Sequence, residues 1–153
     1  MSNICILVAS DLYIQRAELE TQVKQKVNQI GCGVFFDDYD LFPIHKKNNS
    51  FICSFSDDYR FDNCEMLLLP DGCWLNGRRT NIVPFLNRME LLGSIIESIL
   101  DSCKEAELFV GDNGEHMIDE FQPYDVNILD FACFMNQHFN CDRFSAMHLF
   151  LYK

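Results

Sequence analysis

Hydrophobic side chains recur at steps of three and four residues in three segments of the chain, the spacing that places them on one face of a helix. The clearest segment covers residues 82–103. Pro84 stands in its first turn, where the N–H that proline lacks has no helical partner in any case. The other two segments cover residues 12–30, after the capping residue Ser10, and residues 125–140. We therefore expect three helices, with residues 82–103 as the core helix.

Short apolar runs between turn-forming residues predict about six β-strands. They cover residues 5–9, 34–36, 51–55, 66–75, 108–110 and 144–152, the fourth of them as a hairpin. In the last run both alternating sets of side chains are mainly apolar, which is typical of a central strand covered on both faces. Residues 1–153 are therefore predicted to form a single α+β domain, in which a mostly antiparallel sheet of about six strands packs against about three helices.

The composition indicates a folded, soluble protein. Hydrophobic residues make up 48% of the chain, so it can bury a core without cross-links or metals. The apolar run at residues 5–9 is too short for a signal peptide and has no basic residue before it. No stretch reaches the roughly 18 apolar residues that a membrane span needs. We expect a cytoplasmic protein without a membrane partner.

The eight cysteines are expected to be reduced, because no export signal accompanies them. Cys5, Cys53, Cys103 and Cys133 lie inside apolar runs. In such a run a thiol packs like a small hydrophobic side chain. We therefore expect these four cysteines to be buried in the core.

Charge changes this picture most in the second half of the chain. The formal net charge is −11, from 12 basic and 23 acidic residues. Between residues 90 and 130 the only cation is Lys104, and the carboxylates are Glu90, Glu97, Asp101, Glu105, Glu107, Asp112, Glu115, Asp119, Glu120, Asp125 and Asp130. Such a field attracts a basic partner and repels nucleic acid. The alternative is that these carboxylates only keep an aromatic-rich domain soluble.

One part of the acidic stretch mixes carboxylates with aromatic side chains in a loop that contains Gly111 and Gly114. Loops carry recognition more often than the outer faces of helices do, and aromatic side chains often anchor protein interfaces. The predicted partner-binding residues are Asp112, Glu115, Asp119, Glu120, Phe121, Tyr124 and Asp125.

Asp37, Asp38 and Asp40 follow an apolar strand, where some metal-dependent enzymes carry an Asp-x-Asp pair. The chain lacks the parallel βαβ series and the glycine-rich phosphate loop of those enzymes. We interpret the segment as a turn in which the Asp side chains bind backbone groups. A divalent-metal-dependent enzyme that uses these three residues is kept as an alternative function.

Other metal-capable or basic side chains form no recognisable catalytic pattern. Cys133, His138 and Cys141 are of the right type for zinc, but the chain has no Cys-x-x-Cys pair. His148 lies in an alternating apolar strand, where we expect a hydrogen-bonded core or edge residue and not a base. We therefore predict no enzyme activity, no metal site and no cofactor.

The layout resembles that of the immunity proteins of bacterial polymorphic-toxin and contact-dependent growth inhibition systems. The features that carry the resemblance are small size, an opening strand, and an amphipathic helix that leads into residues 107–112 and the acidic segment Asp119-Glu120-Phe121. The resemblance implies an antitoxin that neutralises a basic cognate toxin, such as a nuclease, by occluding its active site or substrate cleft. An acidic adaptor subunit in a stable complex is a further alternative.

Overall fold

The computed structural model describes residues 3–29, 34–36, 51–56, 74–75, 78–79, 85–112, 121–138 and 146–153. These residues form a six-stranded sheet in the order β2-β3-β1-β6-β8-β7. The strands are β1 (Asn3–Leu12), β2 (Val34–Phe36), β3 (Phe51–Ser56), β6 (Cys103–Asp112), β7 (Gln122–Asn127) and β8 (Met147–Tyr152). A separate hairpin joins β4 (Trp74–Leu75) to β5 (Arg78–Arg79).

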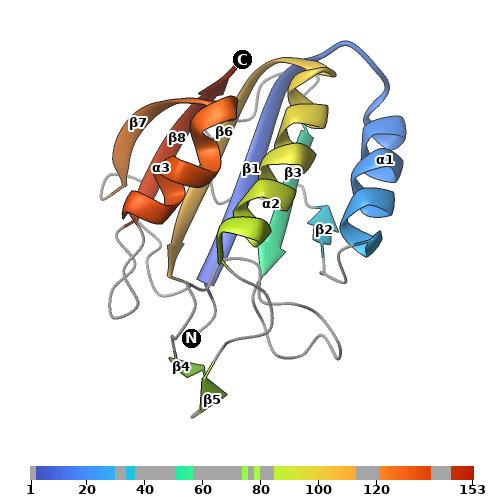
Figure 1. The fold of residues 1–153 in the computed structure, drawn as a ribbon. Coiled ribbons are helices and arrows are strands. Elements are labelled where there is room, and N and C mark those ends of the chain that lie inside the picture. The colour runs from blue at the N-terminus through green and yellow to red at the C-terminus, as the bar shows by residue number, and fades with distance from the viewer. Residues whose placement is uncertain are drawn as a thin grey trace.

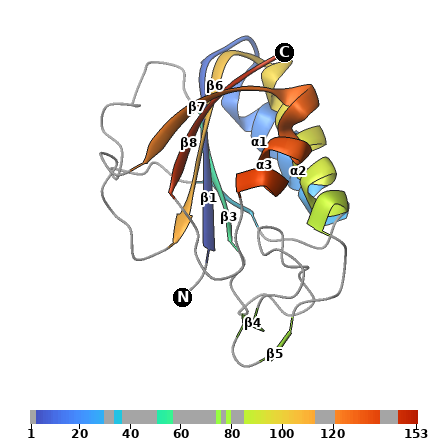
Figure 2. The same cartoon turned by 60° about the vertical axis from the view of Figure 1, so that its left-hand side comes forward.

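The described helices lie together on one face of the sheet, which we call the helix side (Figures 1 and 2). They are α1 (Arg16–Gln29), α2 (Phe85–Leu100) and α3 (Phe131–His138), and a 3₁₀ turn, η3 (Ile128–Asp130), precedes α3. α2 packs between α1 and α3. The opposite face of the sheet is called the far face below. The predicted α+β class is confirmed by this architecture.

The sheet is mixed, a feature that the sequence analysis did not predict. β1 pairs antiparallel with β3 and β6, and β8 pairs antiparallel with β6. β7, however, runs parallel to β8, with Tyr124 opposite Leu149 and Val126 opposite Leu151. A parallel neighbour needs a crossover connection, and η3 and α3 lie in the segment that connects β7 to β8.

The prediction of a helix over residues 125–140 is wrong at its beginning. Residues 122–127 form β7, and the α-helix starts only at Phe131. The change occurs at Asn127, whose side-chain oxygen accepts a hydrogen bond of 2.9 Å from the N–H of Leu129 and so caps η3. The other two helices are shorter than predicted, and the strand predicted at residues 108–110 extends over the whole of β6.

The prediction that residues 144–152 are covered on both faces fails at the end of this strand, although Ala146 is buried and His148 is largely buried. Met147, Leu149 and Leu151 are buried on the helix side. Phe150 and Tyr152 alternate with them and are 39% and 50% exposed. β8 is an inner strand of the sheet, but the described helices cover only one of its faces.

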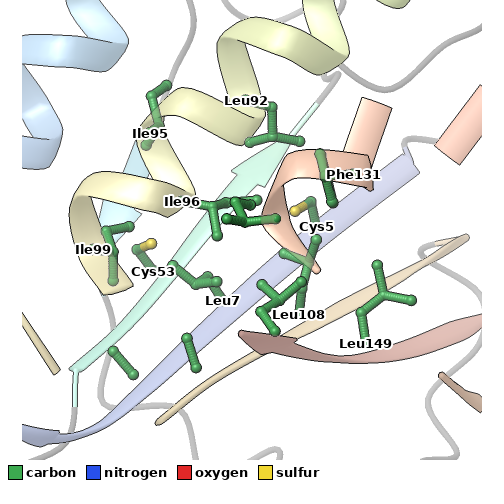
Figure 3. Packing of buried hydrophobic residues seen from close by; sticks show 14 of the residues in the cluster. Cys5, Leu7, Cys53, Leu92, Ile95, Ile96, Ile99, Leu108, Phe131 and Leu149 are labelled. Carbon is green, nitrogen blue, oxygen red and sulfur yellow. The ribbon is translucent and has the colours of Figure 1, made fainter. Parts of the chain in front are cut away.

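The main core lies between the helices and the sheet (Figure 3). Leu92, Ile96 and Ile99 of α2 point toward β1 and β6, where they join Leu7 and Leu108. All five side chains are fully buried. Each stabilises the fold by about 1.5–3 kcal/mol relative to an exposed position. This layer fixes the strands whose ends carry the surface described below.

Three of the four cysteines predicted to be buried are buried, and Cys133 is not. Cys5, Cys53 and Cys103 pack in the helix-side core. α3 is only eight residues long and turns Phe131 and Met135 inward, so Cys133 faces outward. Burial raises the pKa of the Cys53 thiol far above its ordinary value and that of Cys103 to about 11.

Candidate binding surface

The predicted partner-binding residues are only partly within the described structure. Phe121, Tyr124 and Asp125 are described, together with the backbone of Asp112 at the end of β6. Glu115, Asp119 and Glu120 lie outside the described residues, and so do Asp37, Asp38 and Asp40 of the alternative metal site. The structure therefore places the two aromatic side chains of the predicted site, Phe121 and Tyr124, and the carboxylate of Asp125.

Phe121 and Tyr124 pack on opposite faces of the sheet. Phe121 contacts the far-face cluster of Ile6, Val8, Ile52 and Phe109, and its ring meets that of Phe109 edge-on at 5.7 Å. Tyr124 packs against the helix-side core. The alternation of side chains along a strand causes this separation. The two rings therefore cannot anchor a partner at a single surface.

Tyr124 also has aromatic neighbours on α3. Its ring lies 5.2 Å from that of Phe134 and 4.9 Å from that of His138, and the Phe134 and His138 rings stack at 4.3 Å. All three side chains are half-buried. These contacts hold α3 against the edge strand β7, so we assign Tyr124 a structural role.

On the far face, His148 lies between two phenylalanine rings. Its ring stacks on Phe109 at 4.1 Å and is tilted against Phe150 at 4.2 Å. Its Nε2 lies 3.2 Å from Oε2 of Glu107, and both side chains are largely buried. The predicted hydrogen-bonded position of His148 is confirmed. Asp125 is exposed and stands opposite Phe150 in the register of β7 with β8.

A second surface lies at the end of the sheet where β1, β7 and β8 finish and β6 begins. Three large apolar or aromatic side chains are strongly exposed there: Tyr13 at 70%, Leu129 at 82% and Tyr152 at 50%. We call these three residues and the carboxylates of Asp11, Asp101 and Asp130 the aromatic end. All three carboxylates belong to exposed residues.

Hydrogen bonds and an ion pair connect the aromatic end across the sheet. The N–H of Tyr13 donates to the carbonyl of Ser102 at 2.9 Å, and the neighbouring Asp101 forms an ion pair with Lys153. Tyr152 stands opposite Asn127, whose side chain binds the backbone of Leu129. In both views of the fold, the last residues of β1, β7 and β8 and the first residues of β6 lie at the same end of the sheet (Figures 1 and 2).

The aromatic end was not predicted, because its residues fall within elements that the sequence pattern predicts as regular helices and strands. Tyr13 fell in the predicted helix 12–30, and Leu129 in the predicted helix 125–140. One signal was available, because Leu129 lies outside the stripe of Ile128, Phe131 and Met135. An apolar residue off the buried face of a helix is expected to be exposed.

Among the described side chains, the acidic stretch is surface charge except at Glu107. The Glu107 carboxylate is largely buried and lies against His148. The exposed members are Glu90, Glu97, Asp101, Glu105, Asp125 and Asp130. Glu90 and Glu97 lie on the outer side of α2, whereas Asp101 and Asp130 lie at the aromatic end.

Within the described ranges, no three His, Cys, Asp or Glu side chains are grouped as metal ligands, and no helix is long and apolar enough to cross a membrane.

Comparisons with protein-family models, with curated proteins and with solved structures give no match to this chain.

Proposed function

We propose that this chain is a non-catalytic, acidic binding protein of the immunity type, which neutralises a basic cognate toxin. The observation that supports the proposal is the exposure of six carboxylates between residues 90 and 130, where Lys104 is the only cation. An excess of carboxylates over cations repels itself in the folded state. The negative field of these carboxylates attracts a basic surface that approaches it.

In the proposed mechanism, the carboxylates bind the Lys and Arg side chains with which the toxin holds its own substrate. A nuclease is one such toxin, because nucleic acid is bound mainly through cationic side chains. The exposed aromatic and apolar side chains would then supply the buried centre of the contact. The protein acts in the cytoplasm in this proposal, where its thiols stay reduced.

The proposal is tested with the protein encoded immediately upstream, purified in its folded state. We expect a stable complex by calorimetry, an affinity that falls about tenfold or more between 25 and 300 mM NaCl, and loss of the toxin's activity in the complex. No binding at low salt would falsify the proposal. A complex in which the partner stays fully active would instead identify an adaptor subunit.

A titration with Mg²⁺, Mn²⁺ and Ca²⁺ under the same conditions addresses the alternative enzyme. Tight uptake of one of these ions, lost in the variant Asp37→Asn with Asp38→Asn, would support the metal-dependent activity. The inhibitor proposal requires no metal uptake for binding to the upstream protein.

A further inference from the structure

We infer that the aromatic end is the docking surface for a basic protein, with Tyr13, Leu129 and Tyr152 at its centre and Asp11, Asp101 and Asp130 at its rim. The identity of the partner as a toxin rests on the proposed function. The position of the surface rests on the geometry alone. A single exposed leucine is ordinary on a protein surface, but a group of large side chains at one end of a sheet marks an interaction site.

The dimensions of the aromatic end suit the centre of a protein interface. Tyr13 follows β1 and Leu129 follows β7, which are three strand spacings apart, or about 14 Å. Tyr152 ends β8, next to β7. A standard interface covers about 800 Å² on each partner, so all three side chains fit within one contact. Tyrosine is also enriched among the residues that dominate binding energy.

The backbone holds Leu129 outward before any partner binds. Ile128, directly before it, and Phe131, two residues after it, are buried, and the Asn127 side chain accepts from the Leu129 N–H at 2.9 Å. This short capped turn leaves Leu129 in solvent although Ile128 and Phe131 are in the core. A backbone that is already ordered loses less conformational entropy on binding.

Tyr13 is placed by a residue in an uncommon backbone conformation. Asp11 has φ of 56°, the left-handed region that non-glycine residues rarely adopt. Before it, Ala9 faces the helix side and Ser10 the far face; after it, Leu12 again enters the helix-side core and Tyr13 projects from the sheet. Strained backbone of this kind often lies beside functional surfaces.

The charges at the aromatic end select a protein with Lys or Arg around an apolar patch. Lys153 forms an ion pair with Asp101, and Lys104 is also exposed there, against the carboxylates of Asp11, Asp101, Glu105 and Asp130. This excess of negative charge disfavours a second copy of the chain, an anionic lipid surface and nucleic acid. A basic protein with an apolar patch can pair its cations with the carboxylates of the rim and bury the exposed side chains of the centre.

The aromatic end lies at the opposite end of the sheet from Asp112 and Phe121 of the predicted site, so experiments can separate the two. β6 runs from Cys103 at the aromatic end to Asp112 at the other, and β7 runs from Gln122 to Asn127 at the aromatic end. A partner of ordinary size that docks on Tyr13 and Leu129 leaves Phe121 uncovered.

Two probes test the inference: the upstream protein, and a synthetic peptide that alternates arginine with leucine and tryptophan. Each is titrated against the full ¹⁵N-labelled chain, and amide shifts are expected at Tyr13, Leu129 and Tyr152. The variant Leu129→Ser with Tyr152→Ser should lower the affinity for either probe at least about tenfold. Leu91→Ser on α2 is the matched control, because Leu91 is 40% exposed and lies away from this end. It should bind like the wild type.

The possible outcomes distinguish an error in the docking surface from an error in the proposed function. If the upstream protein binds and the double variant binds it equally well, the docking surface is wrong while the proposed function stands. If only the peptide binds, and does so through the aromatic end, the surface stands and the toxin partner is wrong. Shifts confined to residues 112–125, or no binding of either probe, would overturn the inference. The single variant Leu129→Ser repeats the test should the double variant fold poorly.

Discussion

Asp11 shows how one backbone conformation controls where neighbouring side chains go. A left-handed residue with a Cβ is disfavoured by about 1–2 kcal/mol, and Asp and Asn tolerate this conformation better than most because their short polar side chains bind nearby backbone groups. Among the described non-glycine residues, Asp11 is the one with positive φ. The left-handed conformation of Asp11 therefore allows the chain to leave β1 with Leu12 buried and Tyr13 exposed.

Replacing Asp11 tests this explanation. We expect Asp11→Val to lower the free energy of unfolding by about 1–3 kcal/mol, because a β-branched side chain does not fit the left-handed region. Asp11→Asn and Asp11→Gly should stay within about 0.5 kcal/mol of the wild type or exceed it. Urea denaturation of the four proteins measures the difference. Equal stability of the Val and Asn variants would show that Asp11 carries no backbone strain.

Cys103 predicts a pH dependence of stability. Burial raises the pKa of its thiol from 9.0 to about 11, although a hydrogen bond with the backbone of Glu105 lowers it in part. Between these two values the unfolded chain releases the proton that the folded chain keeps, so stability falls as the pH rises through this window. The advantage of the wild type over Cys103→Ala should be full below pH 8 and should shrink between pH 9 and 11. Denaturation series at fixed salt would show this, and a constant difference would contradict it.

At the scale of elements, the contact between α2 and α3 depends on the absence of a side chain. A Cβ added at Gly93 would lie 3.3 Å from Cδ1 of Phe131, which is closer than most real contacts. Phe131 is fully buried and follows η3 directly, so its ring has little room to move. Gly93 thus allows α3 to approach the core, and with it the exposed turn that carries Leu129.

A pair of leucine substitutions on α2 tests this close approach. Gly93→Leu should lower the free energy of unfolding by about 1–3 kcal/mol through overpacking, although leucine favours a helix more than glycine does. Ser94→Leu on the exposed side of the same helix should change it by less than about 0.5 kcal/mol. Chemical denaturation measures both. If the two variants are equally stable, the helices are not in close contact at Gly93.

Elements whose own periodicity determines their burial were predictable from the sequence. α2 is an example, because Leu92, Ile96 and Ile99 mark its buried face without reference to any other element. β7 was not predictable, because Gln122, Pro123 and Asp125 are polar or lack an N–H, and only Tyr124 and Val126 favour a strand. Its parallel pairing with β8 is a tertiary interaction that residues 122–127 do not encode locally.

The candidate site was predictable only as charge. Counting carboxylates located the acidic surface, and the described members of that stretch are exposed except for Glu107. The faces of the aromatic side chains could not be predicted, because they depend on the register of β7. A strand places Phe121 and Tyr124 on opposite faces, whereas the loop assumed for them allowed both to point toward a partner.

At the scale of the whole molecule, a net charge of −11 makes the folded state repel itself. We expect the free energy of unfolding to rise by about 1 kcal/mol between 10 and 150 mM NaCl, as the Debye length shortens from about 30 to 8 Å. The variant Glu90→Lys with Glu97→Lys removes charge from the outer side of α2 and should gain stability mainly at low salt. Urea titrations at both salt concentrations measure this effect, and a flat salt response would contradict it.

The central place of β1 also governs the order in which the chain can fold during synthesis. β1 is made before the other strands of the sheet, yet Ile6 pairs with Phe109, about 100 residues later, and β6 must also pair with β8. Until β6 leaves the ribosome, the edge of β1 that faces it has unsatisfied backbone groups beside apolar side chains, a template for pairing with other chains. A fragment that stops before Cys103 should therefore aggregate instead of forming half of the sheet.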